Sequence, residues 1–149
     1  MADEIHEFLG YQLSLTAHLL QNEHNRRLSE LDMTGAQSKA IYLLNRFGKQ
    51  SQTTLQERMY IKGSTMNGII DTMDKKALIA KSDSASDRRV KEISLTEAGI
   101  HMEKQIWGAI KELEEKLTLG LTEQEKEKML EMLQTIQENV SDGHAIERK

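Results

Sequence analysis

Small polar side chains gather in the middle of the chain, near the expected start of a short helix at about Ser64. Compact donors and acceptors at a helix start suit the major groove of DNA, which is about 12 Å wide. Ser64 and Thr65 also lie where free amides and the helix dipole can meet a phosphate, and at least one is expected to cap the helix. Gly68 leaves the exposed face bare, so a DNA backbone can approach closely. The residues expected to contact DNA from this helix are Lys62, Ser64, Thr65, Asn67, Gly68 and Thr72.

Two further residues of this helix have their own expectations. The amide of Asn67 suits an adenine edge or a phosphate, and a plain exposed polar residue is the alternative interpretation. The carboxylate of Asp71 would be repelled by the phosphates of DNA. We therefore expect Asp71 to pair with a nearby basic side chain instead of touching DNA.

A polar loop at residues 82–89 separates two stretches that resemble short strands, and it carries two arginines near its end. Arg88 and Arg89 can place a guanidinium in the minor groove, where a narrow groove deepens the negative potential. Asp87 can hold one of them by a bidentate pair, so one arginine is expected to read the groove while the other is structural. Ser84 and Ser86 are small enough to let the loop approach DNA, or they serve only as turn residues.

Charge is distributed unevenly along the chain, although the total net charge is only -4. Residues 33–91 carry a net charge of +6, and the two flanks together carry -10. A basic centre between acidic ends indicates a polyanion-binding middle held by helical arms, although such a bias can also be an ordinary solvated surface.

No other set of side chains supports a stronger chemical hypothesis. The chain has no cysteine, which excludes disulfides, Cys-ligated zinc and thiol catalysis. Glu97 and His101 stand four residues apart and could share a metal, but an exposed helical pair is the simpler interpretation and no third ligand is evident. No glycine-rich phosphate loop or nucleophile motif occurs. We therefore expect no enzyme activity, no metal and no cofactor.

The spacing of apolar residues predicts the elements that position these side chains, and it indicates a mainly α-helical fold with a small β-hairpin wing. Thr34 and Ser51 are expected N-caps, Gly48 a left-handed stop, and Thr122 with Glu125 a capping box. Helices are expected at about residues 5–31, 34–46, 51–60, 64–76, 96–117 and 122–140, and strands at 78–81 and 90–95. The helix at 96–117 is expected to bury Ile100, Ile106, Trp107, Ile110, Leu113 and Leu117.

The stretch from Leu55 to Gly99 resembles the winged-helix core of the MarR family of bacterial transcriptional regulators, and the flanking helices extend the resemblance over nearly the whole chain. Its motifs are Ile61-Lys62-Gly63-Ser64-Thr65, Ile70-Asp71, Leu78-Ile79, Asp87-Arg88-Arg89 and Leu95-Thr96-Glu97-Ala98-Gly99. The resemblance implies a winged helix-turn-helix lobe at about 33–95, a helical dimerisation region at about 3–31 and 96–140, a recognition helix at about 64–76 and a wing at about 82–89. The tail at 141–149 is expected to be disordered.

Two residues depart from the family pattern. Ala77 stands where the family usually has glycine, so the helix before it is expected to use a different cap or to carry strain. Lys81 stands where arginine is frequent, which weakens any bidentate contact expected there.

The resemblance also implies partners. Members of the family are commonly homodimeric repressors that read a short pseudo-palindrome and are released by small, often phenolic or other anionic aromatic ligands. A pocket for such an effector would lie between the helical arms and the winged lobe. Its expected lining residues are His18, Asn22, Tyr42, Phe47 and Trp107.

The terminal helices favour a dimer independently of the resemblance, because their apolar stripes are longer than one small lobe can cover. No apolar run approaches the roughly 20 residues that cross a bilayer, and the N-terminus is acidic, so we expect a cytoplasmic protein without a membrane partner. The sequence predicts a sequence-specific DNA-binding regulator, a dimeric repressor that reads a pseudo-palindromic operator with its helix in the major groove and its basic wing in the minor groove. The alternative is an interaction protein whose helical dimer binds another protein and whose winged lobe does not bind DNA specifically.

Overall fold

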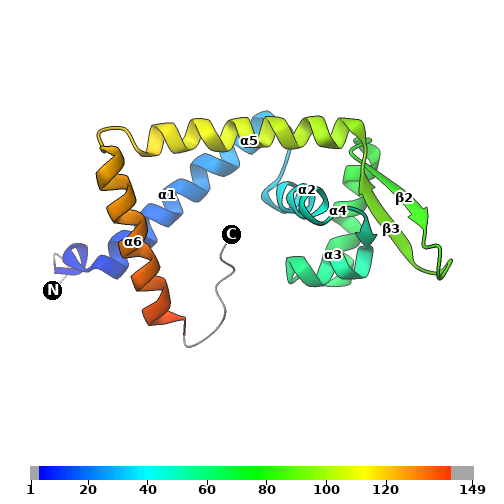
Figure 1. The fold of residues 1–149 in the computed structure, drawn as a ribbon, viewed down its shortest axis with the longest axis horizontal. Coiled ribbons are helices and arrows are strands. Elements are labelled where there is room, and N and C mark those ends of the chain that lie inside the picture. Colours follow the sequence, from blue (N-terminus) through cyan, green and yellow to red (C-terminus); the bar gives the residue numbers. More distant parts are fainter. Residues whose placement is uncertain (1–3, 142–149) are drawn as a thin grey trace. The chain divides into compact units, whose positions relative to one another are not determined.

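The computed structural model describes residues 4–141, which form six α-helices, one short 3-10 helix and three strands (Figure 1). In chain order they are η1 (Glu4–Glu7), α1 (Leu9–Glu30), α2 (Gly35–Phe47), β1 (Gln50–Ser51), α3 (Gln52–Met59), α4 (Gly63–Lys75), β2 (Ile79–Asp83), β3 (Lys91–Leu95), α5 (Glu97–Leu117) and α6 (Glu123–Val140). The mainly helical fold with a small wing is therefore confirmed. The tail expected to be disordered lies, from residue 142 onward, outside the described residues.

The chain forms two compact units that divide within α5, after Leu113. The first unit holds α1 to α4, the three strands and most of α5, and the second holds the end of α5 and α6. Within residues 4–141, no helix is both long enough and apolar enough to span a bilayer.

Side-chain caps start two helices of the first unit at the predicted residues. The Thr34 hydroxyl accepts from the Gln37 amide at 3.2 Å, and the Gln37 side chain accepts from the Thr34 amide at 3.2 Å, which completes a capping box. The Ser51 hydroxyl accepts from the Thr54 amide at 3.0 Å and starts α3. At the other end of α2, Gly48 has a φ of 73°, as expected for a glycine that stops a helix.

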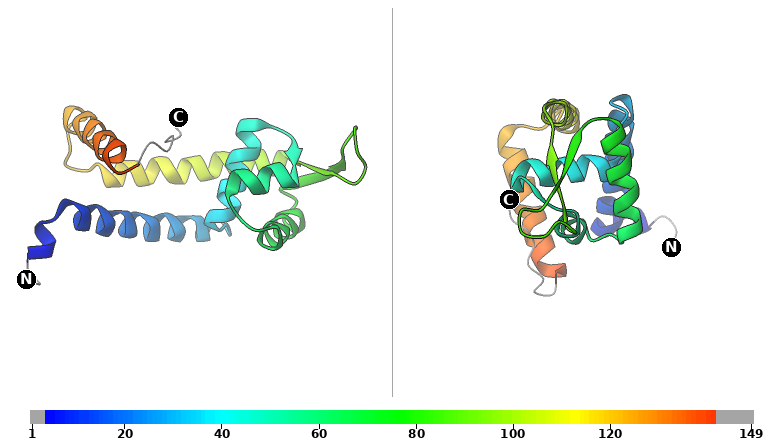
Figure 2. Two further views of the ribbon diagram at one scale, coloured as in Figure 1. Left: turned by 90° about the horizontal axis from the view of Figure 1, so that it is seen from below. Right: turned by 90° about the vertical axis from the view of Figure 1, so that its right-hand side faces the viewer.

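The sheet has three antiparallel strands in the order β1, β3, β2. The hairpin pairs Ile79 with Leu95 and Asp83 with Lys91, and it projects from the helices around it as a wing (Figure 2). The sequence predicted this hairpin but missed β1, in which Gln50 pairs with Ile93. A two-residue strand is too short to show an alternating pattern, and it forms only because β3 supplies its hydrogen-bond partners.

A single hydrophobic core holds the helices of the winged lobe against the sheet. On α4, Met66, Ile70 and Met73 are at most 1% exposed and form one buried stripe at helical spacing. Leu28 from α1 and Ile106 from α5 belong to the same core. The other buried hydrophobic members are Met33, Ala40, Ile41, Leu43, Leu44, Leu55, Met59, Leu78, Ile79 and Ile93.

The long helices bury much less than the sequence predicts. On α5 the expected buried face is wrong at Ile100, Trp107 and Leu117, which are 44%, 39% and 44% exposed, and the buried residues of this helix are Gly99 and Ile106. The first predicted helix is also interrupted, because Phe8 is extended with ψ 127° and separates η1 from α1.

The end of α4 contains a strained residue at a position where the sequence departs from the family pattern that it resembles. Ala77 has a φ of 58°, in the left-handed region that favours glycine. Its amide donates to the Asp74 carbonyl at 2.9 Å, and the Leu78 amide donates to the Met73 carbonyl at 3.0 Å. These two bonds form a complete Schellman motif with alanine where glycine is usual, so the expected strain is present without a different cap.

Replacing Ala77 with Gly is therefore expected to raise the free energy of unfolding by about 1 kcal/mol, because glycine adopts this backbone without a Cβ penalty. Thermal unfolding would detect a rise of the midpoint of about 2–4 °C. The same substitution at Ala109, inside α5, should lower stability by about 1 kcal/mol, and a fall at both positions would contradict the strain argument.

Candidate nucleic-acid interface

Helix α4, which the sequence predicts to read DNA, begins without a side-chain cap. Its N-cap is Lys62, which has φ -76° and ψ 154° and makes no capping hydrogen bond. The expectation that Ser64 or Thr65 caps this helix is wrong, because the helix starts one residue earlier and places both inside its first turn. The first-turn amides have no intrahelical partner, so this end of α4 is open to an anionic group.

The residues of α4 that are expected to contact DNA differ in their exposure and in whether their side chains already make a hydrogen bond. The side chains of Lys62, Ser64 and Thr65 are exposed and make no hydrogen bond or ion pair to other described residues. Around Gly68 there is open space, since nothing lies within 4 Å of a Cβ built there. The half-buried Thr72 differs, because its hydroxyl donates to the Gly68 carbonyl at 2.9 Å and is occupied within the helix.

Gln52 is a residue of this surface that sequence reasoning missed. Its side-chain Nε2 donates to the Oδ1 of Asn67 at 2.6 Å, which joins the first residue of α3 to the outer face of α4. The N-cap at Ser51 was readable in the sequence and placed Gln52 at the start of α3. The approach of Gln52 to Asn67 depends on how two helices pack, which residue spacing does not show.

The acidic residues of α4 lie beside a lysine of the wing. The Lys81 Nζ on β2 is 3.6 Å from Asp71 Oδ1 and 3.8 Å from Asp74 Oδ2. The expectation that Asp71 pairs with a basic side chain is confirmed. Lys81 therefore offsets part of the negative charge of the two carboxylates, which would otherwise repel phosphates. The same ion pairs link β2 of the wing to α4.

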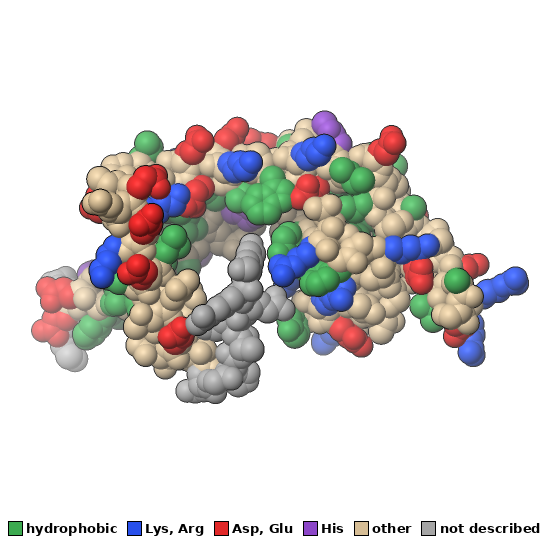
Figure 3. Space-filling view, viewed as in Figure 1, with side chains coloured by type: hydrophobic (Ala, Val, Ile, Leu, Met, Phe, Trp, Pro, Cys, Tyr) green, Lys and Arg blue, Asp and Glu red, His purple; other side chains and the backbone are tan. Residues whose placement is uncertain are grey.

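The two arginines at the wing tip differ in their contacts. Arg89 Nε lies 3.2 Å from Asp87 Oδ1, and its backbone amide donates to the same oxygen at 3.0 Å. These two bonds, the backbone one first, lower the pKa of Asp87, so the carboxylate is ionised at neutral pH. Arg88 is exposed and has no partner among residues 4–141. Lys and Arg side chains accordingly gather at the outer end of the wing (Figure 3).

The two serines of the wing loop have unequal positions. Ser84 is buried and its amide donates to the Val90 carbonyl at 2.9 Å, whereas Ser86 is exposed. Their hydroxyls lie 3.0 Å apart and share a hydrogen bond. Ser84 thus shapes the loop from inside, and Ser86 is the serine that an approaching DNA backbone can reach.

Four of the five residues predicted to line an effector pocket contact other side chains of the first unit, and the fifth, Trp107, is 39% exposed on α5. The His18 Nε2 and Asn22 Nδ2 lie 3.3 Å apart on α1, and the Tyr42 hydroxyl accepts from Arg46 at 2.7 Å. Phe47 is 49% exposed, with the guanidinium of Arg58 4.0 Å from its ring centre.

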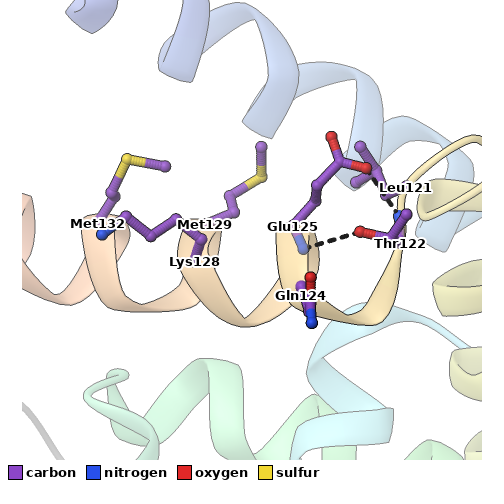
Figure 4. A pocket seen from close by; sticks show the side chains of 7 residues that line it. All are labelled: Leu121, Thr122, Gln124, Glu125, Lys128, Met129 and Met132. Atoms are coloured by element: carbon purple, nitrogen blue, oxygen red, sulfur yellow. Dashed lines mark hydrogen bonds between the residues drawn. The ribbon is translucent and has the colours of Figure 1, made fainter.

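Residues 4–141 also form hollows elsewhere on the surface, and the two described next are lined by none of the five predicted pocket residues. One lies between α1 and α5 and is lined by Arg27, Glu30, Leu31, Gln105, Gly108, Ala109 and Glu112. The other lies along the start of α6 and is lined by Leu121, Thr122, Gln124, Glu125, Lys128, Met129 and Met132 (Figure 4). The capping box of Thr122 and Glu125, which the sequence predicted, forms one end of this second hollow.

Replacing Gly68 with Ala is expected to separate folding from binding. The added methyl meets open space, so helix propensity should raise the free energy of unfolding by about 0.5–1 kcal/mol. If DNA approaches this face closely, affinity for a specific duplex should fall about 5-fold or more, as measured by fluorescence anisotropy. Gly10→Ala on α1, where a Cβ also meets open space, is the control and should leave affinity unchanged. Equal affinity for both variants would show that DNA does not approach at Gly68.

Comparison with known proteins places this surface in context. Residues 33–91 match the model of the MarR family. The HTH-type transcriptional repressor IacR of Pseudomonas putida is 25% identical over 90% of this chain and 80% of its own length. The HTH-type transcriptional repressor MdtR of Bacillus subtilis is 27% identical over 83% of this chain and 80% of its own length.

Solved structures share the fold at lower identity. The YusO protein of Bacillus subtilis superposes with a TM-score of 0.80 at 24% identity, covering 93% of this chain and 98% of that one. A cysteine-to-serine variant of E. coli MarR in complex with operator DNA superposes with a TM-score of 0.69 at 21% identity, covering 86% and 92% of the two chains. The winged lobe and its long helices are thus an arrangement common to these proteins.

Proposed function

We propose that this chain, whose residues 33–91 match the model of the MarR family, is a dimeric transcriptional repressor that binds a pseudo-palindromic DNA operator. Its recognition helix α4 would enter the major groove and its wing the minor groove. Both curated relatives are named as HTH-type transcriptional repressors, and a MarR of the same fold has been crystallised with operator DNA. The site of action would be the cytoplasm, where bacterial DNA lies.

The observation that carries this proposal is the electrostatic arrangement of α4. Its start is uncapped and exposes Ser64 and Thr65, while Asp71 and Asp74 both lie beside Lys81. A surface that binds a polyanion must offer donors and offset its own carboxylates; α4 offers the donors, and Lys81 of β2 offsets part of the charge of the two carboxylates.

A second copy of the chain is the proposed partner of the long helices. Phe8, Leu9 and Leu19 on the N-terminal arm are 63%, 61% and 59% exposed, and no described residue of α6 is buried. Apolar side chains along α1, α5 and α6 would bury their surface in a twofold interface. The two lobes would then reach half-sites roughly 34–36 Å apart, one turn of the DNA helix.

Release by a small aromatic or anionic ligand is proposed for the same dimer. The half-exposed rings of Phe47 and Trp107 offer aromatic surface, and His18 with Asn22 offers polar groups. A ligand that binds the free dimer better than its DNA complex would lower the affinity for the operator.

Fluorescence anisotropy tests the proposed function. The purified full chain is titrated against duplexes tiled across the region upstream of its own gene, at 50 and 200 mM salt, with random duplex as competitor. We expect one duplex with twofold sequence symmetry to resist the competitor. Its affinity should fall roughly 10³- to 10⁵-fold between these salt concentrations if 6–10 phosphates are contacted. Analytical ultracentrifugation should show a dimer in the same buffers.

Weak binding that is equal for all duplexes would contradict the proposal. The exposed apolar helices would then be better explained by an interaction protein that binds another protein through its helical dimer, with a winged lobe that does not recognise DNA.

A further inference from the structure

A hydrogen bond between two amide side chains joins the start of α3 to the outer face of α4. Gln52 Nε2 donates to Asn67 Oδ1 at 2.6 Å, across fifteen residues of sequence. The backbone of Gln52 is held in turn by the cap that starts α3, since the Ser51 hydroxyl accepts from the Thr54 amide at 3.0 Å. The Asn67 side chain is thus fixed from a second helix.

The direction of this bond decides which atoms Asn67 offers to a ligand. With its carbonyl oxygen accepting from Gln52, Asn67 keeps two donors on Nδ2, and Gln52 keeps its Oε1 acceptor. A donor next to an acceptor complements the major-groove edge of adenine, which presents the N7 acceptor and the N6 amino donor. Guanine presents two acceptors at this edge and would find only one donor correctly placed.

We infer that Gln52 is a positioning residue for sequence recognition, which holds Asn67 so that the pair reads one adenine in each half-site of the operator. The inference rests on the proposed function, because it requires a specific DNA site. Both side chains are neutral, so they add little to phosphate attraction and act mainly on the choice of base. The approach to Asn67 is open beside it, since Thr65 is exposed and a Cβ on Gly68 would meet nothing within 4 Å.

The test measures base preference with the full-length chain and its operator duplex. Each base pair of the half-site is replaced in turn. For each protein variant, the affinity for the original duplex is divided by the affinity for the substituted duplex, and this affinity ratio measures base preference at that position. Asn67→Ala should reduce the ratio at one A·T pair by about 5- to 100-fold. Gln52→Ala should reduce the affinity ratio at that same base pair. The variant that carries both substitutions should reduce this ratio no further than Asn67→Ala alone, because the two residues act as one unit.

Gln52→Glu is the sharper variant, because it keeps the shape and removes the donor. A carboxylate can only accept, so Asn67 must turn its Nδ2 toward it and present Oδ1 to the groove. The preference for adenine at that position should then fall. A preference for cytosine should rise, because Asn67 Oδ1 can accept a hydrogen bond from the cytosine amino group. The added negative charge weakens binding to every duplex alike and cancels in the ratio.

Gln56→Ala is the matched control, since Gln56 lies one turn further along α3 and its side chain makes no hydrogen bond to described residues. It should leave every ratio unchanged, and thermal unfolding should be similar for all variants. Unchanged ratios in Gln52→Ala, or a loss at a different base pair that adds to that of Asn67→Ala, would overturn the inference. If the unmodified protein itself shows no base preference, the proposed function fails instead.

Discussion

Replacing Arg88 and Arg89 together with Ala is expected to lower affinity for the operator duplex by about 10- to 150-fold without unfolding the protein. Both side chains lie at the exposed tip of the wing, and the ion pair of Arg89 within residues 4–141 is with Asp87, so their loss removes no core packing. A guanidinium in a narrow minor groove contributes both charge and shape recognition, and both are lost with alanine. Fluorescence anisotropy on the operator and on random duplex, with thermal unfolding in parallel, measures the effect.

A double variant of two α5 lysines controls for the change in total charge. Lys104 and Lys111 are exposed on α5, and replacing both with Ala removes the same two charges away from the wing. This double variant should reduce affinity only slightly, because it weakens only the long-range electrostatic attraction between the protein and DNA. Should the wing variant bind as tightly as this control, the wing would have no part in DNA recognition.

Asp87→Ala separates the two arginines. If the arginine that reads the groove is the one that Asp87 holds, this variant should lose affinity like Arg89→Ala, because Arg89 loses its fixed orientation. If Arg88 reads the groove, Asp87→Ala should bind as well as the unmodified protein or better, since a negative charge leaves the tip.

Replacing Gly99 with Ala is expected to lower the free energy of unfolding by about 2–4 kcal/mol. A Cβ at this position would lie 2.2 Å from the Leu78 carbonyl oxygen and 3.0 Å from Leu95 Cδ2. The Leu78 carbonyl cannot move freely, because it accepts from the Thr96 amide at 3.1 Å beside the first paired residues of the hairpin. The start of α5 would therefore have to move away from the sheet. Thermal unfolding should show a midpoint lowered by roughly 4–16 °C.

Gly108→Ala, on the same helix, is the matched control. Nothing lies within 4 Å of a Cβ built at Gly108, so alanine should raise stability by about 0.5–1 kcal/mol through helix propensity. A similar midpoint for the two variants would mean that α5 adjusts to the methyl at Gly99 at little cost.

The sequence predicted the features that depend on a few neighbouring residues. The caps at Thr34 and Ser51 and the capping box of Thr122 are local patterns of hydrogen bonding, and all three form as expected. The buried stripe of α4 follows from helical spacing alone. The pairing of Asp71 followed from electrostatics, because an unpaired carboxylate does not suit a DNA-reading helix.

The features that were missed depend on contacts between distant segments. β1 needs β3 as its partner, and Gln52 reaches Asn67 only after α3 and α4 have packed. The start of α4 was also missed, because the N-cap is the extended residue Lys62 and not the serine that the sequence predicted. The apolar faces of α5 and α6 were expected to be buried, and hydrophobic spacing cannot say whether the covering surface belongs to the same chain or to another one.

The placement of Leu28 in the core has a consequence for how the protein is made on the ribosome. Leu28 packs in one cluster with Ile106, and Arg27 pairs with Glu112, which follows it by 85 residues. At about 5–20 residues per second, α1 emerges roughly 4–17 s before the segment that covers its end. The winged lobe, whose α2, α3 and α4 follow one another closely, can assemble in that interval. The end of α1 therefore gains its contacts with α5 late in synthesis, although α1 itself is synthesised early. Until then, its apolar side chains stay exposed and can bind chaperones.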